Sequence, residues 1–106
     1  MAKKRVRWNR SHEFARKKST KREVGHPVYV YAKSGNKRKY LTFTHKPETG
    51  KEANYEKLKY NIDAQSNEPC YMKKTHDVAH QNKLNPPDKK YRIHQEDRET
   101  IKMHKK

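Results

Sequence analysis

The sequence is short of residue types on which several kinds of site depend. Its 106 residues include one cysteine, Cys70, and three glycines. A single cysteine excludes an intramolecular disulfide, and three scattered glycines exclude a glycine-rich phosphate loop. We therefore expect neither a disulfide scaffold nor a loop of that type, and we expect no cofactor.

Large apolar side chains are also scarce. Val, Ile, Leu and Phe number five, three, three and two, about an eighth of the chain, and a highly charged chain with under roughly 20% of them verges on disorder. Seven Tyr and Trp8 compensate in part, because one aromatic side chain buries about 150–250 Å². No apolar run reaches the roughly 18–20 residues of a membrane helix, and none follows the basic N-terminus. The sequence predicts one small cytoplasmic domain with a small core.

Positive charge is what the sequence has in excess. Lys and Arg number 28 against 12 Asp and Glu, which gives a formal net charge of +16. Such a chain concentrates polyanions, and each phosphate that it neutralises releases a condensed counterion. Nucleic acid is therefore the expected partner, RNA more than DNA, and a nucleoprotein complex is an alternative. Neither a membrane nor a small-molecule substrate is expected.

The basic residues are concentrated in residues 1–24, which hold ten Lys or Arg against Glu13 and Glu23. Ser11 has the side chain of an N-cap, so a short helix is expected over residues 11–18. A helix of that length is unstable in isolation. We therefore predict a mobile basic arm over residues 1–24, followed by a small α+β domain over residues 25–106.

A β-hairpin is the clearest structural signal. Residues 28–31 (Val-Tyr-Val-Tyr) and 40–44 (Tyr-Leu-Thr-Phe-Thr) favour strands, and residues 34–36 (Ser-Gly-Asn) favour a turn. Alternation predicts the two valines on one face and the two tyrosines on the other, with Leu41 and Phe43 sharing a face. Lysines and an arginine surround the turn.

The rest of the chain predicts short elements. Pro47 and Gly50 indicate a loop over residues 45–54. Alternating apolar residues at 58, 60 and 62 favour a third strand over residues 55–62, with a helical turn at 55–58 as the alternative. We further expect a short edge strand at residues 70–72 and helices at 76–84 and 95–106. Ile93, Ile101 and Met103 would face the sheet, which completes a small antiparallel sheet with one or two short helices.

Nucleic-acid contacts are expected in the arm and around the hairpin turn, where positive charge follows a phosphate backbone and aromatic rings stack on bases. The predicted contact residues are Lys3, Lys4, Arg5, Arg7, Trp8, Arg10, Arg16, Lys17, Lys18, Lys21, Arg22, Lys37, Arg38 and Lys39. A solvated, solubilising tail is the competing interpretation of the arm. The hairpin tyrosines are expected to be core residues for the most part, because the chain has little else to bury.

Metal binding has weak support. His76 and His80 lie four residues apart, so they would share a face of the predicted helix, and Cys70 and His45 are further potential ligands. However, Asp77 stands where a metalloprotease helix has glutamate, and there is no second cysteine. No metal site is therefore expected.

Catalysis is left open by the sequence. His45, His76, His80 and Tyr71 have side chains that small metal-independent ribonucleases use for acid–base steps. Residue type alone assigns no role in a chain with seven histidines and seven tyrosines. Cys70 is interpreted as a structural thiol. No catalytic residue is assigned, and the protein is interpreted as non-enzymatic.

Three stretches together resemble a group of small basic proteins of bacterial mobile elements. They are residues 26–31 (His-Pro-Val-Tyr-Val-Tyr), residues 40–45 (Tyr-Leu-Thr-Phe-Thr-His) and residues 91–106, which have an acidic start and a lysine-rich end. The resemblance implies a phage, plasmid or transposable element as the setting. It implies no mechanism.

Three functions follow as hypotheses. The first is a non-enzymatic nucleic-acid-binding accessory or regulatory protein, which should show salt-dependent binding. The second is an inhibitor of a host defence nucleoprotein such as a CRISPR effector, which should bind a protein complex tightly and naked nucleic acid weakly. The third is a small endoribonuclease toxin, which should cleave RNA without added metal.

Overall fold

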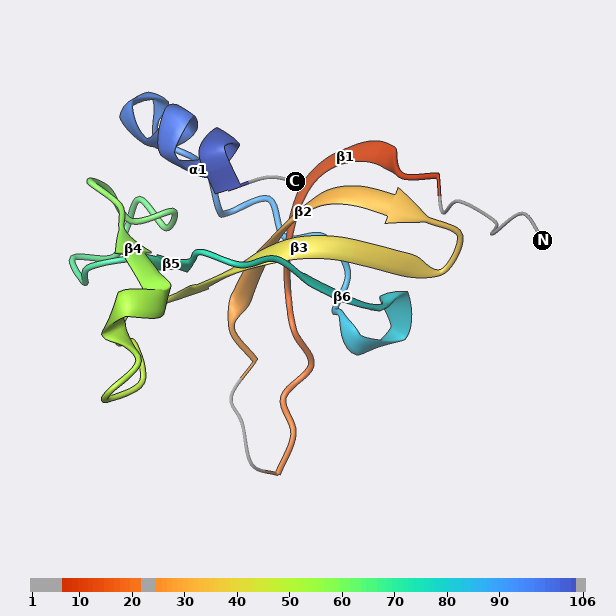
Figure 1. Ribbon diagram of the computed structural model, residues 1–106, viewed down its shortest axis with the longest axis horizontal. Helices are drawn as coiled ribbons and strands as arrows, with labels where there is room; N and C mark the ends of the chain where they lie inside the picture. Colours follow the sequence, from red (N-terminus) through yellow and green to blue (C-terminus); the bar gives the residue numbers. More distant parts are fainter. Residues whose placement is uncertain (1–6, 22–24, 105–106) are drawn as a thin grey trace.

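The computed structural model of the protein describes residues 7–21 and 25–104. The elements, in chain order, are β1 (Asn9–Arg16), β2 (Pro27–Ser34), β3 (Lys37–Thr44), η1 (Glu52–Asn54), β4 (Tyr55–Lys57), β5 (Tyr71–Lys73), β6 (Asp77–His80), η2 (Gln81–Lys83), η3 (Gln95–Asp97) and α1 (Arg98–His104). All strand pairs are antiparallel, and the sheet has the order β1-β2-β3-β5-β4 with β6 also paired to β3 (Figure 1). The predicted α+β class, with a small antiparallel sheet and a short C-terminal helix, is confirmed.

The predicted hairpin consists of β2 and β3. Gly35 in its turn has φ +55°, a left-handed conformation that glycine adopts without steric cost. The valines of β2 pack in one apolar cluster, and Tyr29 and Tyr31 pack in the other with Leu41 and Phe43, as expected. The register shifts between Val30 and Ala32, so Ala32 joins the tyrosines in their cluster.

The predicted helix over residues 11–18 is wrong, because residues 9–16 form strand β1. Phe14 pairs with Tyr29 and packs in its cluster, while Ala15 pairs with Val28 and packs on the opposite face. Burial on both faces outweighs the weak local preference for a helix that Ser11 indicates. Residues 9–16 of the predicted arm therefore form a strand of the domain.

The third predicted strand is shorter than expected. Strand β4 covers residues 55–57 of the predicted 55–62. The alternative prediction of a helical turn at residues 55–58 is wrong. Leu58 and Ile62 are buried, but Tyr60 between them is 46% exposed. Strand β5 forms where a short edge strand was predicted, but it lies between β3 and β4 rather than at the edge. Strand β6 pairs only with residues 37–40 of β3, so Phe43 and Thr44 at the end of β3 are available to pair with β5.

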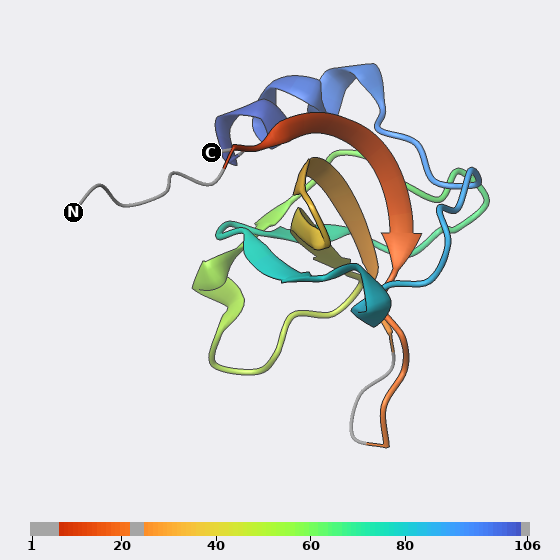
Figure 2. The same cartoon turned by 90° about the vertical axis from the view of Figure 1, so that its right-hand side faces the viewer.

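The predicted helix over residues 76–84 is also wrong. Strand β6 forms instead and pairs with the first half of β3, which would otherwise present unpaired backbone groups. The chain then crosses to the other edge of the hairpin. Leu84 bridges Lys17, and the backbone N–H of Asp88 donates to the carbonyl of Phe14. The β-structure thereby curls almost into a ring (Figure 2). Ala79 of β6 and Leu84 pack against the smaller apolar cluster.

The C-terminal helix covers the larger apolar cluster. Helix α1 follows η3, within the residues 95–106 predicted as helix. Ile101 is 1% exposed and Ile93 packs against the same cluster, as expected, but Met103 is 71% exposed, so its predicted contact with the sheet is wrong. Asp97 is buried, and its carboxylate accepts hydrogen bonds from the backbone N–H groups of Lys59 and Tyr60. Within residues 7–21 and 25–104, no helix has the length and apolar character needed to cross a membrane.

Candidate nucleic-acid interface and a second pocket

A groove lies between strand β1 and helix α1. The ribbon of α1 lies beside that of β1 (Figures 1 and 2). Trp8, Arg10, His12 and Phe14 line it from β1 and the residue before it, because alternate residues of a strand face the same side. Arg98 and Lys102 are among the residues that line it from α1. The groove has a volume of about 1060 Å³.

Positive charge dominates the lining of the groove. The cationic side chains are Arg10, Lys39, Arg92, Arg98 and Lys102. Glu99 is the only carboxylate among the lining residues. The groove therefore has a strong excess of positive charge, which favours anionic over cationic ligands.

Two aromatic rings border the cationic side chain of Lys39. Its Nζ lies 5.5 Å from the centre of the Trp8 ring and 5.8 Å from the centre of the Tyr31 ring, both within cation–π range. The register explains this cluster. Ala32 pairs with Arg10 of β1 and with Lys39 of β3, so Lys39 lies near Tyr31, next to Ala32, and near Trp8, two residues before Arg10. Neighbouring strands thus bring one ammonium group and two aromatic rings together at the turn end of the sheet.

Hydrogen bonding orders the floor of the groove. Nδ1 of His12 lies 2.7 Å from the hydroxyl of Tyr29. Burial raises the pKa of the Tyr29 hydroxyl, and the positive charge of Arg98 opposes that shift. Tyr29 therefore stays protonated at neutral pH and links β1 to the hairpin.

The structure splits the predicted nucleic-acid residues into separate groups. Trp8, Arg10 and Lys39 line the groove. Arg7 and Lys37 are exposed near the same end of the sheet, and Lys18 and Lys21 are exposed beyond the other end of β1. Four predicted residues lie outside the described part of the chain: Lys3, Lys4, Arg5 and Arg22.

Three of the predicted cations are engaged within the protein. Arg38 donates to the carbonyls of Gly35 and Lys37 and to Oε1 of Gln81, so it ties the turn to η2. Arg16 donates two hydrogen bonds to the carbonyl of Gly25, and Lys17 lies over the ring of Tyr40. Arg38 and Arg16 are therefore tied to backbone carbonyls, and none of Arg16, Lys17 and Arg38 lines the groove.

Sequence reasoning missed four of the groove residues: His12, Arg92, Arg98 and Lys102. One signal was available, because Trp8, Arg10, His12 and Phe14 follow the two-residue period of a strand. The other cations lie far along the chain and reach the groove only through the packing of Ile101 and Ile93 against the core. No local pattern indicates that placement.

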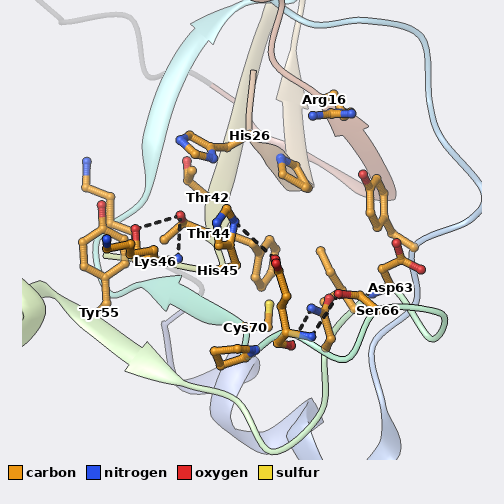
Figure 3. Close-up of a pocket in the computed structure, with 18 of the residues that line it drawn as sticks. Arg16, His26, Thr42, Thr44, His45, Lys46, Tyr55, Asp63, Ser66 and Cys70 are labelled. Atoms are coloured by element: carbon orange, nitrogen blue, oxygen red, sulfur yellow. Dashed lines mark hydrogen bonds and ion pairs between the residues drawn. The ribbon is translucent and has the colours of Figure 1, made fainter. Parts of the chain in front are cut away.

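A second pocket lies at the end of the hairpin away from the turn (Figure 3). Its volume is about 760 Å³. His26 precedes β2 and His45 follows β3, so the antiparallel hairpin brings both to this pocket. The segment between β4 and β5 closes the other side with residues that include Asp63, Ser66 and Glu68.

Charges of both signs line this pocket. The cations are Arg16, Lys17, Lys46 and Lys73, and the carboxylates are Glu48, Asp63 and Glu68. Nδ1 of His45 lies 3.7 Å from Oε2 of Glu68. The hydroxyl of Thr44 donates to the carbonyl of Lys46 and accepts from its N–H. The pocket is thus balanced in charge and built largely from loops.

The Thr42 side chain stands out in this pocket. Thr42 is only 6% exposed, and its hydroxyl has no hydrogen-bond partner among the described residues. It is the one buried side-chain oxygen or nitrogen in that part of the chain for which this holds. Most buried polar side-chain atoms in proteins are hydrogen-bonded, because an unpaired buried hydroxyl costs free energy.

The histidines that suggested metal binding or catalysis are not brought together. His76 and His80 share no helix face, since β6 replaces the predicted helix. The described residues contain no group of three or more His, Cys, Asp or Glu that could hold a metal ion. Of the candidate ribonuclease residues, His45 lines the second pocket, whereas His76, His80 and Tyr71 do not.

Comparisons with known proteins leave the functional argument to this geometry. No protein-family model, curated protein or solved structure matches the chain.

Proposed function

We propose that the protein binds single-stranded nucleic acid, RNA in preference to DNA, through the groove between β1 and α1, without cleaving it. The observation that carries the proposal is the position of Lys39 beside the partly exposed ring of Trp8, within a groove lined by four further cations and one carboxylate. Cationic grooves that follow a backbone, combined with rings on which bases stack, are the usual means of binding a single strand.

A single strand suits this groove better than a duplex does. Stacking requires a base face that is not already covered by its neighbours, and loops and single strands of RNA provide such bases. Trp8 is partly buried against the larger apolar cluster, so its ring is held in place before binding. A fixed ring loses little conformational freedom on binding, which favours affinity.

The proposal keeps the protein as an accessory or regulatory factor of a mobile element. That setting rests on the resemblance of residues 26–31, 40–45 and 91–106 to small basic proteins of such elements. The groove supports nucleic-acid binding and does not depend on the setting.

The test is fluorescence anisotropy with a labelled single-stranded RNA and a DNA of the same sequence, over a range of salt concentrations. The groove variant combines Arg10→Gln and Lys39→Gln. The control combines Lys51→Gln and Lys74→Gln, which remove the same charge from exposed positions outside the groove. Both variants carry the same net charge, so a difference between them reports position.

We expect the groove variant to bind RNA about tenfold or more weakly than the control does. We also expect its salt slope to fall by about 1.4, because each contact with a single-stranded phosphate contributes about 0.7. Equal weakening in both variants would show that the charge acts without a defined site. RNA cleavage in the presence of a chelator would instead favour a metal-independent ribonuclease. Weak binding by the wild-type protein, with tight capture of a nucleoprotein complex, would favour the inhibitor.

A further inference from the structure

We infer that a second basic surface, formed around η2 by Lys18, Lys37, Arg38 and Lys83, binds the phosphate backbone of a nucleic-acid duplex. None of these four residues lines the groove or the second pocket. The sequence predicted Lys18, Lys37 and Arg38 as nucleic-acid contacts, and the fold places Lys83 with them. Duplex binding at this η2 surface goes beyond the proposed function and does not rest on it.

Hydrogen bonds join three distant segments of the chain around η2. The N–H of Gln81 donates to the carbonyl of Asn36 at 2.6 Å, and the guanidinium of Arg38 donates to Oε1 of Gln81 at 2.9 Å. At the other end of η2, the N–H of Lys18 donates to the carbonyl of Lys83 at 3.0 Å. The hairpin turn, η2 and the residues that follow β1 are therefore held side by side.

The three joined segments carry positive charge and no negative charge. Residues 16–21, 34–38 and 80–85 include six Lys or Arg and no Asp or Glu. Within residues 7–21 and 25–104, no cation of the η2 surface forms an ion pair with a carboxylate. The one acidic residue of β6, Asp77, lies 3.4 Å from Nζ of Lys73 instead. The positive charge of the surface is therefore available to an anionic partner.

The placement of Lys18 and Lys83 gives a further reason. Both side chains are exposed, and they start from adjoining backbone positions. Like charges on neighbouring extended segments repel each other, which reduces stability. A polyanion that lies across both lysines removes this repulsion.

Arg38 adds a cation that is fixed before any ligand binds. Its guanidinium donates to the carbonyls of Gly35 and Lys37 and to the amide oxygen of Gln81, and none of these acceptors carries a charge. Arg38 therefore keeps its full positive charge in a set position. A group that is already ordered loses little conformational freedom on binding, which favours affinity.

The residue types of the η2 surface favour a duplex over a single strand. Residues 16–21, 34–38 and 80–85 contain no Trp, Tyr or Phe, so they offer no ring on which an unpaired base could stack. Lys and Arg contacts with phosphates position a protein on a duplex without reading its bases, and a duplex carries about one phosphate per 1.7 Å of its axis. If the groove binds a single strand as proposed, the protein would hold a single strand and a duplex together.

The test is fluorescence anisotropy with three labelled probes: a blunt-ended RNA duplex, a DNA duplex of the same sequence and a single-stranded RNA of the same length. The surface variant combines Lys18→Gln and Lys83→Gln, and the control again combines Lys51→Gln and Lys74→Gln, so both carry the same net charge. We expect the surface variant to bind duplex about tenfold or more weakly than the control does, and single-stranded RNA within about threefold of it. For the DNA duplex the salt slope should fall by about 1.8, because each phosphate contact contributes about 0.9. Thermal unfolding should show the surface variant at least as stable as wild type, which separates lost binding from lost folding.

The groove variant, Arg10→Gln with Lys39→Gln, separates the two sites. It should bind duplex within about threefold of the control, whatever it does to single-stranded RNA. Duplex binding that is weakened only in the surface variant supports the inference even if the groove binds no RNA, and a preference for the RNA or the DNA duplex identifies the helical form that fits. Equal weakening of duplex binding in the surface variant and the control overturns the inference. A wild-type protein that binds single-stranded RNA but neither duplex overturns it while leaving the proposed function intact.

Discussion

The groove and the pocket lie on neighbouring parts of one small domain, yet they differ in the balance of charge among their lining residues. The groove has five cations against one carboxylate, on strand β1, helix α1 and the neighbouring segments. In the pocket, four cations and three carboxylates nearly balance, and a buried hydroxyl is unpaired within the described chain. An excess of exposed positive charge attracts polyanions in a salt-dependent way, whereas nearly balanced charges produce no such general attraction.

The two regions also differ in how they are built. In the groove, adjacent strands fix the side chains by register. In the pocket, side-chain hydrogen bonds hold the loop between β4 and β5: Asn61 donates to the carbonyl of Glu68, and Asp63 accepts from the N–H of Gln65. We therefore expect small backbone changes to damage the pocket before they damage the groove.

The largest expected effect comes from Gly25→Ala at the pocket end of β2. A Cβ at this position would lie 1.8 Å from the carbonyl oxygen of Lys17, so the β1 and β2 backbones would have to separate. We expect unfolding free energy to fall by about 3 kcal/mol or more. At the groove end, Gly35→Asn should cost less than about 1 kcal/mol, because asparagine tolerates a left-handed conformation in open space. Chemical denaturation measures both, and equal losses would contradict the assigned clash.

Asp97→Ala should damage both regions together. Its carboxylate accepts from the N–H groups of Lys59 and Tyr60, at 2.9 and 3.0 Å, and so joins η3, which precedes α1, to the segment that closes the pocket. Leaving these donors unpaired should reduce the unfolding free energy by about 2–3 kcal/mol. Asp88→Ala is the control, because Asp88 accepts one exposed bond from the N–H of Lys90. Chemical denaturation compares the two variants, and equal losses would contradict the assigned role of Asp97.

Trp8→Ala tests whether the groove binds by stacking as well as by charge. We expect RNA affinity to fall about tenfold, since stacking of one base contributes about 1–3 kcal/mol. The salt slope should stay unchanged, in contrast to Lys39→Gln, which removes a phosphate contact. Trp8→Phe should retain most of the affinity. Anisotropy titrations at several salt concentrations give both quantities, and a change in slope for Trp8→Ala would contradict a stacking role.

The smallest effect concerns Cys70 in the wall of the pocket. Burial raises the pKa of its thiol above the ordinary 9.0, and Asp97 adds to the shift while a hydrogen bond with the Ile62 backbone opposes it. The native state therefore favours the protonated thiol, so this contribution to stability is complete below pH 9 and declines as pH rises through the raised pKa. At pH 8, iodoacetamide should alkylate native Cys70 more than about tenfold more slowly than the denatured chain. Equal rates would show that the pocket exposes the thiol.

Local signals were enough for part of the fold. Alternating valine and tyrosine, a turn glycine and the second run ending in Phe43 and Thr44 specify the hairpin, because strand preference, alternation and turn chemistry agree there. The acidic start of residues 95–106 agrees with the observed helix. Elsewhere the local patterns misled, since helices were predicted over residues 11–18 and 76–84, where strands β1 and β6 form.

The candidate sites were only partly foreseeable. Trp8, Arg10 and Lys39 were predicted, and all three line the groove. Arg16 and Lys17 were predicted with them but lie at the other end of β1, because an extended strand carries its ends far apart. The pocket was not predicted, since its residues come from many separate stretches of the chain, from Arg16 to Tyr91.

By itself, the sequence determined the charge, the absence of a disulfide and the hairpin, because composition is fixed and neighbouring residues decide turns and alternation. Tertiary structure alone decided that residues 9–16 and 77–80 are strands, since short segments without strong propensity take the conformation that pairs open sheet edges. It also decided which cations line the groove and left the Thr42 hydroxyl buried at a pocket. Both depend on contacts between distant segments, which no local pattern encodes.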